Sequence, residues 1–181
     1  MPSPAASTAS FRTLLRRFGR NRRGSAAVEF AVIAPVFFGL LFAIIETAII
    51  FFAGQVLETI TQSSARYVMT GQAQNSNFQA SDFKTYLCNQ IPAAMFTCAN
   101  ISVDVQSSTA FSNFNLTLPI DAGGNFINNM QYSPGIQGSV VRVVVYYPWP
   151  QFVTGLGYNI TNMAGNKRLL IAAAAFRNEP Y

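Results

Sequence analysis

The chain contains no histidine, and only 10% of its 181 residues are charged. The lack of histidine argues against a zinc site, because two cysteines alone cannot complete the usual set of four ligands. It also removes the most common general base from any catalytic site. No glycine-rich phosphate loop, Ser-Lys pair or carboxylate pair stands out. We therefore expect no metal, no cofactor, no small-molecule substrate and no enzymatic activity, which leaves a membrane-anchored hydrolase with almost no support.

Acidic residues are absent from the first 24 positions, which hold six of the twelve basic residues. These six are Arg12, Arg16, Arg17, Arg20, Arg22 and Arg23. The rest of the chain has six basic and seven acidic residues, so the net charge of +5 belongs to this basic leader. A nucleic-acid-binding protein needs a basic face on its folded part. We therefore expect no nucleic-acid partner.

A long apolar run from Phe30 to Ala53 follows the leader, with Glu46 as its one ionisable residue. As a helix the run is about 36 Å long, enough to cross a hydrocarbon core of about 30 Å. A removable signal peptide has a shorter apolar part and small residues at its cleavage site, whereas this run ends in Phe51 and Phe52 before Ala53. A buried core helix is rarely so uniformly apolar. The pattern favours a single membrane anchor.

The position of the arginines predicts the orientation of this anchor. Basic segments beside an apolar span stay in the cytoplasm. The chain after Gly54 would then lie outside, which in a bacterium with two membranes is the periplasm.

Glu46 is the unusual residue of the apolar run. It lies about 10 Å of helix from the outer end, a depth at which a carboxylate is unfavourable. Two interpretations remain open: a contact with another helix in an assembly, or a lone protonated acid tolerated near the membrane edge.

A glycine, Gly24, separates the basic leader from Ser25 and the apolar run. Arg22 to Pro35 resembles the N-terminal signature of TadE-like pseudopilins. These are minor pilin-like proteins of the tight-adherence (Tad) system, which builds Flp-type type IVb pili. Ala43 to Glu46 and the C-terminal Phe176 to Tyr181 are similar to family sequences as well.

The resemblance implies that a prepilin peptidase cuts between Gly24 and Ser25. Glu29 and Phe30 would become the fifth and sixth residues of the mature chain. The new Ser25 amine would be largely protonated at neutral pH, and Glu29 would pair with the N-terminus of a neighbouring subunit during assembly. From the residues alone, Gly24 and Glu29 are equally consistent with an ordinary juxtamembrane glycine and a solvated acid.

The function implied is that of a minor structural subunit supporting assembly of a Tad/Flp pilus. Its partners would be the prepilin peptidase, other pilins and pseudopilins of the system, and the inner membrane. TadG-like relatives carry a further large domain for which this chain is too short, and the sequence does not separate TadE-like from TadF-like roles. The alternative is a periplasmic binding or sensor module on an uncleaved signal anchor. It predicts retention of residues 1–24 and a ligand pocket in the soluble domain.

Beyond the membrane, the apolar spacing continues at helical period. We predict one helix from about Ala26 to Gln72, a polar loop over residues 71–80, and a short helix from Ser81 to Pro92. Alternating and β-branched runs then predict strands. These lie at residues 101–105, 114–118, 140–147 and 169–176, with a Gly- and Asn-rich loop from Asp121 to Gly138.

The predicted fold class is α+β: a long N-terminal transmembrane and amphipathic helix, followed by a small antiparallel periplasmic sheet. The predicted division is a basic cytoplasmic leader at residues 1–24, the helix at 25–72 and the periplasmic domain at 73–181.

Two further features concern the soluble part. Cys88 and Cys98 would form a disulfide outside the cytoplasm, and closing so short a loop contributes about 2–3 kcal/mol in the chain-entropy model. The alternative is a pair of buried free thiols. Phe152 and Tyr158 either mark a contact surface or are buried under their loop.

Overall fold

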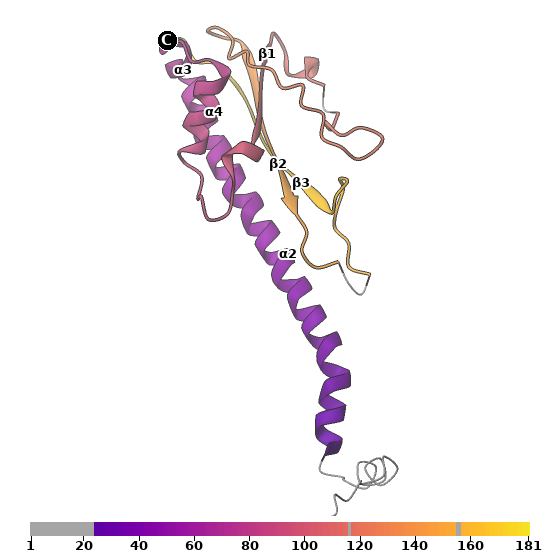
Figure 1. Cartoon of the computed structure of the whole chain (residues 1–181). Coiled ribbons are helices and arrows are strands. Elements are labelled where there is room, and N and C mark those ends of the chain that lie inside the picture. Colours follow the sequence, from indigo (N-terminus) through magenta and orange to yellow (C-terminus); the bar gives the residue numbers. More distant parts are fainter. Residues whose placement is uncertain (1–23, 116, 155–156) are drawn as a thin grey trace, which may run out of the picture. The chain divides into compact units, whose positions relative to one another are not determined.

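The structure is a computed structural model that describes residues 24–115, 117–154 and 157–181. Its helices are α2 (Ser25–Met69), α3 (Gln72–Asn75) and α4 (Ala80–Cys88), with two 3-10 turns, η2 (Cys98–Asn100) and η3 (Phe111–Asn113). Its strands are β1 (Ser102–Ser108), β2 (Val140–Pro150) and β3 (Lys167–Arg177) (Figure 1). The predicted α+β class is confirmed. Two compact units divide at Phe42 and Ala43, and each is described by itself.

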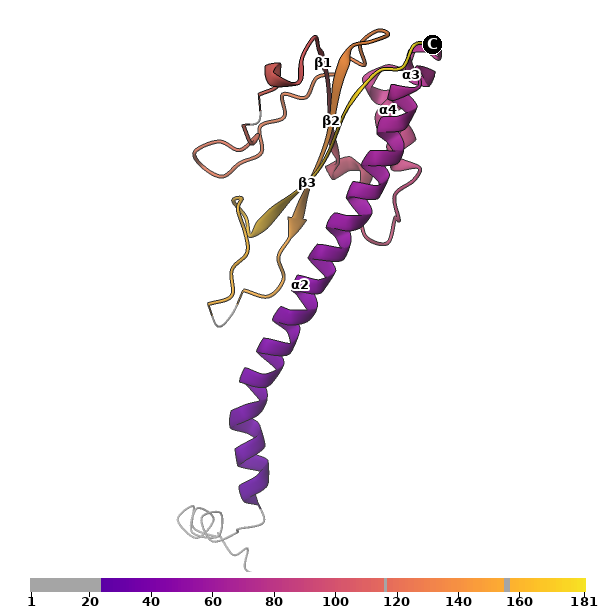
Figure 2. The ribbon, with the colours of Figure 1, turned by 180° about the vertical axis from the view of Figure 1, so that it is seen from behind.

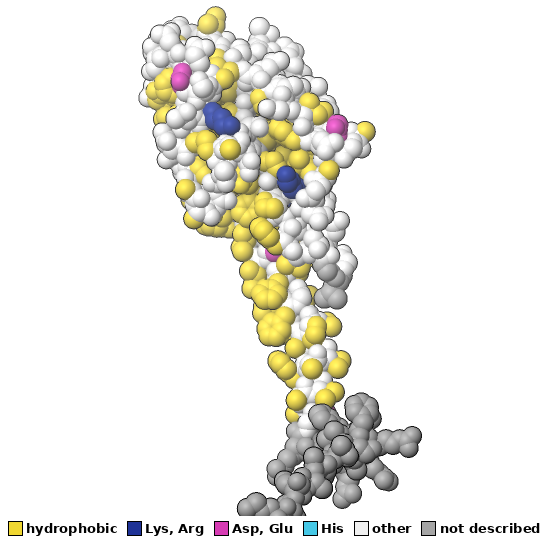
Figure 3. Space-filling view, in the orientation of Figure 1, with side chains coloured by type: hydrophobic (Ala, Val, Ile, Leu, Met, Phe, Trp, Pro, Cys, Tyr) yellow, Lys and Arg dark blue, Asp and Glu magenta, His cyan; other side chains and the backbone are white. Residues whose placement is uncertain are grey.

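The first unit is the N-terminal part of α2, with apolar side chains exposed around the helix (Figure 3). Phe30, Val32 and Ile33 are each about two-thirds exposed. Pro35 lies inside the helix without ending it. The described part of the chain has one helix long and apolar enough to cross a membrane, judged by length and composition. Only 6% of its most apolar window is buried, which argues against the core helix of a soluble protein.

The second unit, Ala43–Tyr181, is built on a three-stranded antiparallel sheet in the order β1-β2-β3. Both views show α2 and α4 against one face of this sheet (Figures 1 and 2). Leu57 of α2 and Leu87 of α4, both fully buried, pack there with Val145 of β2. Nearer the end of α2, Val68 joins Phe83 in a second buried cluster.

The other face of the sheet is covered by loop residues. Val144, Tyr146 and Leu169 are buried there, and the side chains packed on them are Ile120, Phe126, Met130 and Met163. Burial on both faces explains why β2 reads as a continuous apolar run instead of an alternating one. The predicted Asp121 to Gly138 segment is indeed a loop, and through Phe126 and Met130 it completes this second core.

The predicted strand at residues 114–118 is wrong. Phe114, Asn115, Thr117 and Leu118 are not in a strand, and residue 116 lies outside the described part of the chain. Instead the guanidinium of Arg142 donates to the Asn115 carbonyl and lies 5.3 Å from the centre of the Phe114 ring. These contacts hold the segment as a loop over the sheet.

The helices beyond α2 differ in detail from the prediction. The expected polar loop at residues 71–80 contains the short helix α3. α4 ends at Cys88, well before Pro92, and Gln79 rather than Ser81 precedes its first turn as the N-cap. The Gln79 N–H donates to the Asp82 carboxylate at 2.8 Å, which satisfies one otherwise unpaired donor at the helix start.

Tyr132 provides a test of the packing between the loop and α4. Its ring lies 5.7 Å from that of Phe83, and its hydroxyl has no hydrogen-bond partner within the described residues. Burial raises the pKa of Tyr132 to about 12, with a smaller contribution from Asp82. Because folding favours the neutral phenol, this contribution to stability is intact below about pH 10 and is lost as the pH rises towards 12.

We therefore expect Tyr132→Phe to reduce the loss of stability between pH 10 and 12. At pH 8 the variant should leave the free energy of unfolding unchanged or raise it by about 1 kcal/mol, because an unpaired buried hydroxyl is removed. The measurement is urea unfolding of the full chain in detergent micelles, followed by fluorescence of Trp149, the single tryptophan. Tyr181→Phe, at a more exposed tyrosine, is the control. Identical alkaline profiles for both variants would contradict this account.

Candidate functional site: the processing junction and the Glu46 cluster

The predicted cleavage point lies where α2 begins. Gly24 is exposed and immediately precedes the helix, which starts at Ser25. No described atom lies within 4 Å of the position that a Cβ on Gly24 would take. Packing among the described residues therefore does not explain the glycine, and the predicted cleavage after it stays a prediction. The leader arginines lie outside the described residues.

Glu29 and Phe30 follow in the second turn of α2, and both side chains are exposed. The predicted pairing of Glu29 with a neighbouring subunit stays a prediction.

Glu46 has a different environment, because it is buried, with 6% of its surface exposed. One carboxylate oxygen accepts the N–H of Phe152 at 2.5 Å, and the other accepts the N–H of Val153 at 3.0 Å. Both donors belong to the loop that follows β2. The carboxylate therefore has a contact within its own chain that the sequence did not predict. The predicted role of Glu46 in subunit assembly stays a prediction.

Three further side chains hold the same loop. The Thr47 hydroxyl lies 2.5 Å from the Tyr158 hydroxyl and also donates to the Ala43 carbonyl at 2.8 Å. Gln151, 7% exposed, donates its amide N–H to the Val153 carbonyl at 2.5 Å and accepts the Ile160 N–H at 3.3 Å. We call Glu46, Thr47, Gln151 and Tyr158 the Glu46 cluster.

Only part of this arrangement could be predicted from the sequence. The sequence singled out Glu46 as unusual, and it singled out Phe152 and Tyr158 as aromatic. Phe152 is 77% exposed, whereas Tyr158 is half-buried in the cluster. The contribution of Gln151 was missed, and the only signal for it is its place directly after a strand.

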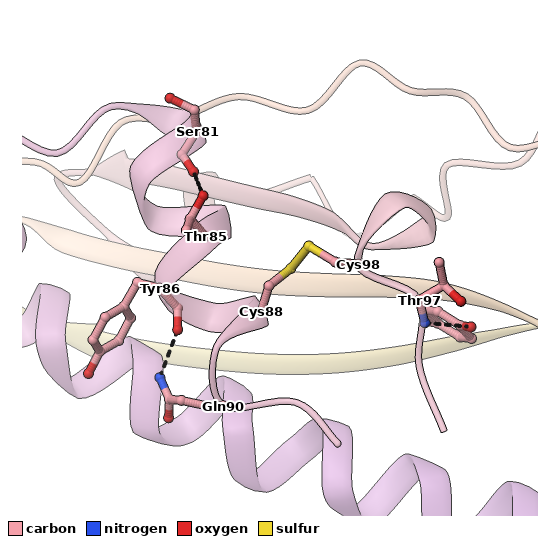
Figure 4. The surroundings of a disulfide bond; sticks show 8 residues. Ser81, Thr85, Tyr86, Cys88, Gln90, Thr97 and Cys98 are labelled. Carbon is pink, nitrogen blue, oxygen red and sulfur yellow. Dashed lines mark hydrogen bonds between the residues drawn. A yellow bond between two sulfur atoms is a disulfide. The ribbon is translucent and has the colours of Figure 1, made fainter. Parts of the chain in front are cut away.

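The predicted disulfide between Cys88 and Cys98 is present, and the alternative of free thiols is wrong. It joins the last residue of α4 to the first residue of η2, with the two Cα atoms 5.7 Å apart (Figure 4). Beside it the Thr97 N–H donates to the Tyr147 hydroxyl at 3.3 Å. The bond therefore ties α4 to the segment leading into β1.

No metal-binding chemistry is found in the part of the chain that the structure describes, which has no group of three or more Cys, Asp or Glu able to hold an ion. An open groove of about 610 Å³ lies within the second unit, between α2 and β3. Residues lining it include Glu58 of α2, Arg168 of β3 and the apolar side chains of Ile50 and Leu170.

Residues 24–66 match the family model described as TadE-like protein. A search of the curated proteins and a search of the solved structures each found no match. The matched segment begins at Gly24 and includes Glu29, Phe30 and Glu46 within α2. Over residues 24–66 the chain is therefore similar to the TadE-like family, as its N-terminal sequence predicts.

Proposed function

We propose that the protein is a pseudopilin, a minor structural subunit that supports assembly of a Tad/Flp type IVb pilus. The observation that carries the proposal is the family match, which begins at Gly24 and covers most of α2. The TadE-like family supports an association with the Tad pilus system and a structural instead of a catalytic role. Prepilin peptidase would cut between Gly24 and Ser25, and other pilins or pseudopilins would be the partners of the mature chain.

The proposed topology has residues 1–24 in the cytoplasm, the helix of residues 25–72 anchored in the inner membrane, and residues 73–181 in the periplasm. The exposed apolar surface of α2 is compatible with a single-pass anchor. The six leader arginines support a cytoplasmic N-terminus. The Cys88–Cys98 disulfide supports an oxidising compartment for the sheet.

Gly24→Lys is the substitution that tests this proposal. We expect complete loss of processing, because a long charged side chain replaces the residue that must fit the protease cleft. The measurement is the intact mass and N-terminal sequence of the membrane-extracted protein, produced with and without its cognate prepilin peptidase. The unsubstituted chain should begin at Ser25 only when the peptidase is present.

Gly54→Lys is the matched control. Gly54 lies within α2 and, like Gly24, has no described atom within 4 Å of an added Cβ, so this variant should still be processed. An unsubstituted chain that keeps its leader beside an active peptidase would contradict the proposal. The protein would then be treated as a signal-anchored binding or sensor module, and the groove beside Glu58 and Arg168 would be screened for ligands.

A further inference from the structure

We propose that the loop between β2 and β3 rests on the membrane that α2 crosses, with Phe152 among the lipids at the surface nearest the sheet. This inference rests on the membrane anchor of the proposed function. It adds a second lipid contact, made by a segment more than 100 residues after Glu46. The partner is a phospholipid surface.

The depth of Glu46 along α2 is the first observation. A hydrocarbon core of about 30 Å takes about 20 helical residues, so a span that starts at Ala26 ends at Ile45. A span that ends instead at Ala53 places Glu46 about 10 Å inside the core. In both cases Glu46 lies at or below the membrane boundary. The N–H groups of Phe152 and Val153, at 2.5 and 3.0 Å from its carboxylate oxygens, must lie there as well.

The composition of the loop is the second observation. No Asp, Glu, Lys or Arg occurs from Gln151 to Asn166, although the loop connects two strands at the surface of the second unit. Phe152 is 77% exposed, the highest fraction among the large apolar residues described. Lys167 and Arg168 follow directly at the start of β3, where cations would meet the phosphates of the lipid headgroups. An aromatic side chain with flanking cations is typical of a membrane interface.

The pairing of the backbone is the third observation. In water, the N–H groups of an exposed loop can hydrogen-bond to solvent, whereas in an apolar medium each unpaired group costs several kcal/mol. Here Glu46 accepts two of them, and the Gln151 side chain accepts the N–H of Ile160. The Gln151 N–H donates to the Asn166 carbonyl at 2.8 Å. These four N–H groups are thus paired while the Phe152 side chain remains exposed, which suits a lipid environment.

A second protein chain is the other occupant to consider for Phe152. Ile49 of α2 lines the same pocket as Phe152. Ile45 and Ile49, in the turns beside Glu46, are 44% and 45% exposed. The exposed apolar surface of the loop therefore lies beside the surface that the membrane already covers, and lipid is the occupant favoured.

Photolabelling of the unsubstituted full chain tests the inference. The chain would be placed, one copy per disc, in phosphatidylcholine nanodiscs that contain a phosphatidylcholine with a photoreactive group near the top of its acyl chain. Trypsin cuts after Arg and Lys, so the sequence yields three informative peptides: 24–66 from the anchor, 143–167 with Phe152, and 85–142 with Ile136. Ile136 is 76% exposed and serves as the matched apolar control.

Ile136 is a suitable control because of its place along α2. Its carbonyl accepts from Asn178, and the next residue, Glu179, donates to the Met69 carbonyl. Met69 lies about 35 Å of helix beyond Glu46. We expect adducts on peptides 24–66 and 143–167, with at least five-fold less on 85–142. Phe152→Ser should reduce labelling of 143–167 several-fold and leave 24–66 unchanged. Because Phe152 is exposed, this variant should fold normally.

The outcomes separate the inference from the anchor. Labelling of 24–66 alone, with 143–167 no higher than 85–142, would overturn the loop contact and leave the anchor standing. Absence of label from all three peptides would remove the anchor and the loop contact together. Equal labelling of 143–167 in the Phe152→Ser variant would show that the adducts arise elsewhere in that peptide and would also overturn the inference.

Discussion

Asp104→Ala is expected to lower the free energy of unfolding by about 3–5 kcal/mol, because it leaves a charge without its partner in a buried site. Asp104 is 4% exposed, and its carboxylate lies 3.0 Å from the guanidinium of Arg142. The same carboxylate accepts the side-chain amide of Gln106 and, at 2.9 Å, the N–H of Gln131. It therefore joins β1, β2 and the loop that covers the second face of the sheet.

The measurement is urea unfolding of the full chain in detergent micelles, followed by Trp149 fluorescence. Glu58→Ala is the matched control, because that acid accepts one hydrogen bond, from Gln62 on the helix surface. We expect it to change stability by less than about 0.5 kcal/mol. Asp104→Asn should fall between the two, since the amide oxygen can still accept but the negative charge is gone. Similar effects for Asp104→Ala and Glu58→Ala would show that the ion pair does not hold the loop.

Phe83→Ala is the second substitution with a large expected effect. We expect it to lower the free energy of unfolding by about 3–5 kcal/mol. Phe83 of α4 is fully buried and packs in the cluster that includes Val68 of α2 and Val143 of β2. Truncation removes these contacts and leaves a cavity that the surrounding helix and sheet can fill only in part. The same urea experiment measures the loss.

Phe111→Ala supplies the comparison for Phe83, because the same side chain is 57% exposed in η3. We expect Phe111→Ala to lower the free energy of unfolding by less than about 1 kcal/mol. The difference between the two variants measures the burial of the ring and not the loss of a phenyl group as such. If both phenylalanines gave the same result, the packing of α4 on the sheet would have to be reconsidered.

Segments with a long or strong pattern were predicted well. The helix predicted from Ala26 to Gln72 is observed as Ser25–Met69, because continuous apolar sequence followed by apolar residues at helical spacing permits little else. The strand predicted at 169–176 is observed as Lys167–Arg177 despite its run of alanines. There, pairing with β2 overrides the helical preference of alanine.

Segments that depend on distant partners were predicted poorly. The alternation at residues 114–118 is typical of a strand, but Arg142 binds the Asn115 carbonyl and packs on Phe114. The local pattern contains no sign of that arginine. The contacts of Glu46 were likewise not predictable. An acid in an apolar run is visible in the sequence as unusual, but the two N–H groups that bind it lie more than 100 positions later.

That separation of 106 and 107 positions also sets an order of events during synthesis. At about 5–20 residues per second, Phe152 leaves the ribosome roughly 5–20 s after Glu46. Throughout that interval the carboxylate lacks the two N–H groups that later bind it. In the topology that we propose, the anchor helix is therefore synthesised before the donors that pair with its buried acid.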